Sequence, residues 1–132
     1  IKNFGLKQGA IASSVAHDSH NIIAIGATPK DLQLAVNAII EHRGGVSVHN
    51  SELNETRVLP LPIAGLMSNL SADEVARTYS QLDASAKQLG SQLRAPFMSL
   101  SFMGLLVIPQ LKMSDLGLFD ANTFSLCSID KS

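Results

Sequence analysis

Residues 10–26 read AIASSVAHDSHNIIAIG, and this stretch decides the fold. Two short segments of small or apolar residues, 10–16 and 22–26, enclose the polar residues from His17 to Asn21. Short, largely apolar segments of this kind are typical of buried strands. The polar residues therefore predict a turn or a bend held between two hydrophobic strands.

A helix is predicted directly after this unit. Thr28 can cap a free backbone N–H, Pro29 suits the first helical position, and Asp31 lies where the helix dipole favours a carboxylate. Apolar residues then recur at a spacing of three to four as far as Ile40, and Gly44 is expected to end the helix.

Two strands and a second helix should follow. Residues 46–49 alternate as a strand does, and residues 56–61 would return as its partner. Ser71 and Glu74 have the spacing of a capping box, which predicts the start of a helix that ends before Gly90.

The last third of the chain is less regular. Residues 97–108 are apolar, and both a strand and a buried helix fit them. Residues 111–120 resemble a loop with Asp115 and Gly117 as turn residues, and residues 124–129 favour a last strand.

This order of elements predicts one α/β (or α+β) domain over residues 1–132. Helices would pack on a mixed β-sheet in a two-layer or three-layer sandwich. Hydrophobic residues make up 45% of the chain, which excludes a disordered chain. Charged residues make up only 16%, against about 25% in an average protein. Either another domain or subunit covers part of the surface, or the shortage is ordinary sequence variation.

Charge and composition also exclude several partners. A net charge of −1, with no Trp and one Tyr, argues against a nucleic-acid partner. The charge-free residues 95–111 are too few, and too interrupted by Pro and Gly, to span a membrane. A single cysteine, Cys127, cannot form an internal disulfide, so we expect a cytoplasmic protein. Because the chain starts at Ile1 with no signal peptide, we expect a piece of a longer chain.

The densest polar cluster supplies the candidate catalytic residues His17, Asp18, His20 and Asn21. Imidazoles exchange protons near neutral pH or ligate metals, and a neighbouring carboxylate can orient them. The alternative is that Asp18 and Asn21 fix a turn while the histidines make ordinary surface or interface contacts. His49, at the end of a predicted strand, is expected to be exposed. No Walker loop, G-x-G-x-x-G, G-x-S-x-G or Cys-x-x-Cys motif occurs.

Three ordered motifs resemble the carboxy-terminal domain of bacterial-type adenine deaminases, of the amidohydrolase superfamily. The first is residues 9–23, which contain His17-Asp18-Ser19-His20-Asn21. The second is residues 59–68, LPLPIAGLMS, and the third joins PFMSLSF at 96–102 to VIPQLK at 107–112.

The resemblance implies an intact enzyme of purine salvage that hydrolyses adenine to hypoxanthine and ammonia. It implies a manganese or iron ion on an amino-terminal TIM-like barrel, where a metal-bound hydroxide attacks the purine. That barrel is not in this sequence, so no metal ligand or cofactor is assigned here, and the chain alone is expected to be inactive. Implied partners are the chain's own barrel, adenine and further copies in a homo-oligomer.

Two other hypotheses stay open. The chain would be a noncatalytic interaction or oligomerisation domain, or a small metal-dependent hydrolase that uses the turn from His17 to His20. If the resemblance to adenine deaminases holds, His17, Asp18 and His20 are expected to lie on the surface that meets the barrel.

Overall fold

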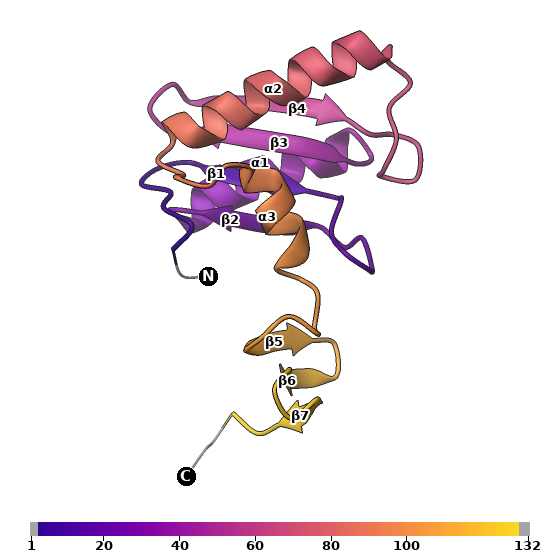
Figure 1. Ribbon diagram of the computed structural model, residues 1–132. Helices are drawn as coiled ribbons and strands as arrows, with labels where there is room; N and C mark the ends of the chain where they lie inside the picture. The colour runs from indigo at the N-terminus through magenta and orange to yellow at the C-terminus, as the bar shows by residue number, and fades with distance from the viewer. Residues whose placement is uncertain (1–2, 130–132) are drawn as a thin grey trace.

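The computed structural model describes residues 3–129, which form a three-layer sandwich followed by a separate small sheet (Figure 1). The α+β combination of the predicted fold class is confirmed. In chain order, the elements are β1 (Ala10–Ser13), β2 (Ile23–Gly26), α1 (Pro29–Glu41), β3 (Gly45–Asn50), β4 (Glu55–Pro60), α2 (Ala72–Gln88), α3 (Pro96–Phe102), β5 (Leu111–Ser114), β6 (Gly117–Asp120) and β7 (Ser125–Cys127).

The first sheet has four strands in the order β2-β1-β3-β4. In the hairpin of β1 and β2, Ala10 lies opposite Gly26 and Ser13 lies opposite Ile23, as the strand–turn–strand prediction requires. Every neighbouring pair in this sheet is antiparallel, whereas a mixed sheet was expected. Direct turns join β1 to β2 and β3 to β4, so each of these pairs is antiparallel. The connection through α1 carries the chain from β2 past β1, so β3 pairs antiparallel with β1.

Helices cover both faces of this sheet, which makes three layers. Successive strand residues point to opposite faces, so β1 contributes to a core on each face, while β3 contributes Val46 and Val48 to one core only. The core under α1 contains Ala10, Ala12, Ala35 and Ile39. The larger core, under α2 and α3, includes Ile11, Val46, Val48, Leu59, Leu82 and Leu100.

Both predicted helix starts are confirmed at the level of single hydrogen bonds. Thr28 Oγ1 accepts a hydrogen bond of 3.1 Å from the backbone N–H of Asp31. Ser71 and Glu74 make the reciprocal capping box at the start of α2. Gly44 follows α1 with a φ of +125°, a conformation that glycine adopts at little cost.

The carboxy-terminal third resolves what the sequence left open. Residues 96–102 form the helix α3, which starts at Pro96 and buries Phe97 and Leu100. Residues 111–120 form a hairpin and not the expected loop, because β5 and β6 pair on either side of Asp115. The expected last strand is present as β7.

Strands β5, β6 and β7 form a second antiparallel sheet. In Figure 1 this sheet lies beyond the end of α3, away from the four-stranded sheet and without a helix on it. Within residues 3–129, no helix combines the length and the apolar character that crossing a lipid bilayer requires.

Candidate functional site

The predicted candidate residues lie together on the turn that joins β1 to β2. The backbone N–H of His17 donates to the carbonyl of Ser101 in α3 at 2.9 Å, and that of His20 donates to the carbonyl of Ala16 at 2.7 Å. Asn21 donates from its side-chain amide to Ser19 Oγ at 3.1 Å. The first bond ties the start of the turn to α3, and the other two hold the turn together from within, so its polar side chains extend from a hydrogen-bonded backbone.

The two histidines of the turn have different environments. The ring of His17 is half-buried and stacks on Phe102, with 4.5 Å between ring centroids and 19° between planes. The ring of His20 is exposed and lies 5.9 Å from that of His17. His17 is therefore held in place by α3, and His20 is presented to the surroundings.

Asp18 and Asn21 are exposed beside two hollows in the surface. Asp18 and Ser19 line a hollow of about 300 Å³ whose other wall is residues 104–107. Ser19 and Asn21 line a hollow of about 480 Å³ together with Met113 and its neighbours on β5. The turn thus lies between the sandwich and the small sheet, and it borders both.

His17 also lines an apolar cavity of about 350 Å³. This volume is at the lower end of the range for small-molecule sites, about 300–1,000 Å³. Tyr79 lines the cavity, and burial followed by the nearby charge of Asp83 raises the pKa of its hydroxyl. The phenol is therefore neutral near pH 7. The other lining residues are Ser13, Val15, Val46, Leu61, Phe97, Met98 and Ser101.

The residues of the turn do not fit a resident metal. Residues 3–129 hold no group of three or more His, Cys, Asp or Glu side chains placed to share one ion. A catalytic metal site in a protein commonly has three protein ligands. The described residues 3–129 therefore do not fit the manganese or iron implied by the resemblance.

A second polar cluster is buried between α1 and β3, and the sequence did not predict it. His49 was expected to be exposed, but only 2% of it is accessible, and Asp31 is 5% accessible. His49 Nδ1 is 2.8 Å from Thr56 Oγ1, and its Nε2 is 3.6 Å from Asp31 Oδ1. His49 follows Ser47 on the face of β3 that packs on α1, where Ser47 donates to the carbonyl of Ala35. The two-residue spacing from Ser47 is the sequence feature that indicates that His49 is buried against α1.

The Asp31 carboxylate is held ionised inside this cluster. Burial raises its pKa, but hydrogen bonds from Thr28 and Ser51 and the attraction of His49 outweigh burial, so the pKa lies below its usual value. Thr28 and Ser51 hydroxyls each donate to the carboxylate at 2.8 Å, and Gly9 N–H donates to Ser51 Oγ at 2.8 Å. The cluster joins β1, α1 and β3 and is closed to solvent, so it serves the fold.

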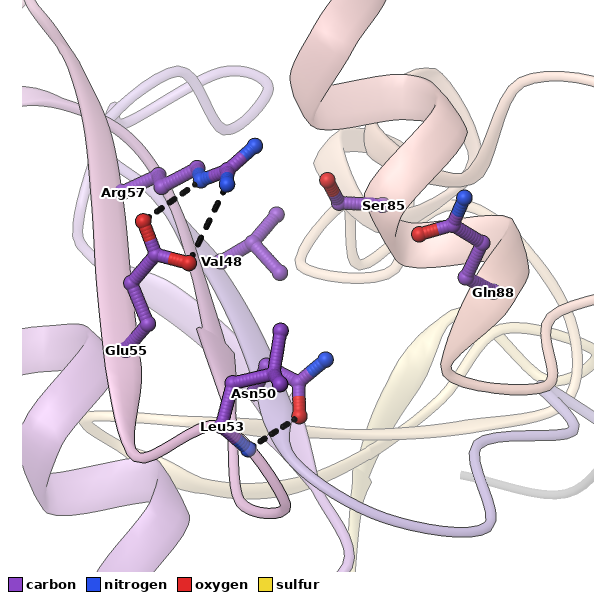
Figure 2. Close-up of a pocket in the computed structure, with 7 residues that line it drawn as sticks. All are labelled: Val48, Asn50, Leu53, Glu55, Arg57, Ser85 and Gln88. Atoms are coloured by element: carbon purple, nitrogen blue, oxygen red, sulfur yellow. Dashed lines mark hydrogen bonds and ion pairs between the residues drawn. The ribbon is translucent and has the colours of Figure 1, made fainter.

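Figure 2 shows a further cavity, between the β3–β4 hairpin and α2. Arg57 makes a two-pronged ion pair with Glu55, at 2.9 and 3.1 Å, facing Ser85 and Gln88 of α2. The cavity volume is only about 50 Å³. Since one water occupies about 30 Å³, this space admits little more than water and is not a ligand site.

Comparison with known proteins places these features in a family. The sequence model described as "Adenine deaminase C-terminal domain" matches residues 1–125. The chain is 55% identical over 129 residues to the adenine deaminase of Methanosarcina barkeri, and 56% identical over 125 residues to that of Salinibacter ruber. These alignments cover 98% and 94% of this chain, but only 23% and 22% of the two relatives. The chain thus spans less than a quarter of the length of these relatives.

Fold and site together define a small α+β domain that presents a polar turn at its surface. The chain belongs to the adenine deaminase C-terminal domain family.

Proposed function

We propose that residues 1–132 are the carboxy-terminal domain of an adenine deaminase that hydrolyses adenine to hypoxanthine and ammonia in purine salvage. The family match and the relatives that are four times longer support this proposal. The catalytic metal, manganese or iron, would be held by an amidohydrolase barrel outside these residues, in a cytoplasmic homo-oligomer. The chain alone is then expected to be inactive.

The turn from His17 to Asn21 is the part of this domain that we assign to the active-site side. One observation carries the assignment: exposed ionisable side chains project from an anchored turn whose first histidine is clamped by Phe102. Asp18 makes no side-chain hydrogen bond to any other residue between 3 and 129, so its carboxylate is free for a partner from outside. His17, Asp18, His20 and Asn21 would contact the barrel, touch adenine or exclude water from the site.

The test uses a rebuilt enzyme in which these 132 residues replace the matching segment of the Methanosarcina barkeri relative. His20→Ala is expected to lower kcat for adenine by about tenfold or more, in the range of positioned proton-transfer groups, with no change in Tm. His42→Ala is the matched control, because His42 is also exposed but caps the far end of α1. An unchanged kcat in His20→Ala would refute the assignment of the turn to the active site.

A parallel assay compares adenine deamination, with added manganese, by the isolated chain and by the rebuilt enzyme. Only the rebuilt enzyme should release ammonia. Release by the isolated chain would instead make the turn from His17 to His20 a catalytic centre, and bound metal measured per chain would identify the alternative metal-dependent hydrolase.

An interaction domain without any role in the active site is the second candidate. It is favoured by the large apolar side chains that β5 to β7 expose. In that case His20→Ala would leave kcat unchanged, while substitutions on the small sheet would weaken assembly.

A further inference from the structure

Both faces of the small sheet of β5, β6 and β7 carry large apolar side chains. Cross-strand partners share a face, so Leu111, Met113 and Leu118 lie on one side. Lys112, Phe119 and Leu126 lie on the other, where Phe124 also packs edge-on against Phe119. A free-standing sheet in water is normally apolar on one face only.

Much of this apolar surface is open to solvent. Met113 is 79% exposed, Leu116 is 77% exposed and Phe124 is 69% exposed. Three short strands without a helix bury little, and an exposed apolar patch of neighbouring residues marks an interaction surface. The sheet therefore exposes large apolar side chains of the kind that an interface covers.

The surface of the sheet continues into the surface of the polar turn. Met113, Ser114 and Asp115 line the same hollow of about 480 Å³ as Ser19 and Asn21. Leu106 forms part of the wall between them. Any body that covers β5 on this side also meets the turn.

We propose that the β5–β7 sheet docks onto the part of the longer adenine deaminase chain that lies outside these residues. Relatives at 55% identity have more than three-quarters of their length beyond the matched segment, which supplies a body large enough to cover the sheet. A symmetric contact between two copies would bury one self-complementary patch and leave the other face of the sheet open. Docking here also brings the turn from His17 to Asn21 against that body. The inference rests on the proposed function, because it needs the longer chain.

Thiol labelling tests this docking without using activity as the readout. Met113→Cys and Leu53→Cys are each made in the isolated chain and in the rebuilt enzyme, and labelling is followed for each peptide by mass spectrometry. Leu53 is the matched control, because it is 66% exposed but lies on the turn between β3 and β4. The variants replace exposed residues, so both should fold.

Met113→Cys should react at least about tenfold more slowly in the rebuilt enzyme than in the isolated chain, since docking removes the thiol from water. Leu53→Cys should react equally fast in both. Equal rates for Met113→Cys, or equal slowing at both positions, would overturn the proposal. Protection of Met113→Cys in the isolated chain that grows with its concentration would identify a second copy as the occupant and would also overturn it. A rebuilt enzyme that protects Met113→Cys but does not deaminate adenine would refute the proposed function and leave the docking intact.

Discussion

Asp31 Oδ1 lies 3.6 Å from Nε2 of His49, and both side chains are buried. The pair joins the first turn of α1 to the end of β3, across one face of the four-stranded sheet. Hydroxyl groups of Thr28, Ser51 and Thr56 complete its hydrogen bonds. Within residues 3–129, no buried side-chain nitrogen or oxygen lacks a partner.

Replacing the carboxylate should destabilise the domain. Asp31→Asn keeps the shape of the side chain but removes the charge that accepts two hydroxyl hydrogen bonds, and bonds to charged groups contribute about 1.5–3 kcal/mol each. We expect a loss of about 1–3 kcal/mol in the free energy of unfolding, measured by urea denaturation. Asp73→Asn, in the exposed first turn of α2, is the control and should change stability by less than about 0.5 kcal/mol. Equal effects of the two substitutions would refute a special role for Asp31.

The same carboxylate should make stability depend on pH in acid. The pKa of Asp31 in the folded chain is below 3.8, the usual value that applies when the chain is unfolded. Its contribution to stability is therefore fully present well above pH 3.8, and it is lost as the pH falls through the folded pKa. Urea midpoints of the wild type and Asp31→Asn should converge below about pH 4, and midpoints that stay parallel would contradict this.

Truncating a core side chain under α2 should lower the free energy of unfolding more than Asp31→Asn does. Leu82 is almost fully buried between α2 and the sheet, so Leu82→Ala loses its burial and leaves a cavity. Comparable substitutions cost about 2–5 kcal/mol. Leu53→Ala, at an exposed position, should stay within about 0.5 kcal/mol of the wild type, and thermal melts of the two variants make the comparison.

Phe102 should act on catalysis through His17. Its ring stacks on the imidazole, so Phe102→Ala frees His17 to adopt other rotamers. In the rebuilt enzyme we expect kcat to fall about threefold to tenfold, with recovery in Phe102→Tyr, which restores an aromatic face. A stability defect without a change in kcat would show that the stack serves only packing.

Features set by neighbouring residues could be predicted from the sequence. Thr28 with Asp31, and Ser71 with Glu74, are three residues apart, so their capping bonds follow from local chemistry. The turn from His17 to Asn21 follows in the same way from the apolar segments on either side. The helix at 96–102 could not be predicted in this way, because a short apolar segment is compatible with both a strand and a buried helix.

Contacts between distant residues were beyond such reasoning. His49 is buried only because β3 turns that face toward α1, and its partner Asp31 is on another element. The clamp on His17 comes from Phe102, on a helix far along the chain. The candidate residues could therefore be located from the sequence, but the side chains that position them could not.

Both hydrophobic cores in the described residues 3–129 lie in the sandwich, and within that range residues 103–110 link the sandwich to the small sheet. We therefore expect the isolated chain to unfold in more than one step, because unfolding of the small sheet exposes little of the interior of the sandwich. Amide hydrogens of β5 to β7 would exchange with solvent long before those of β1 and β3, and a single melting temperature would describe only the sandwich.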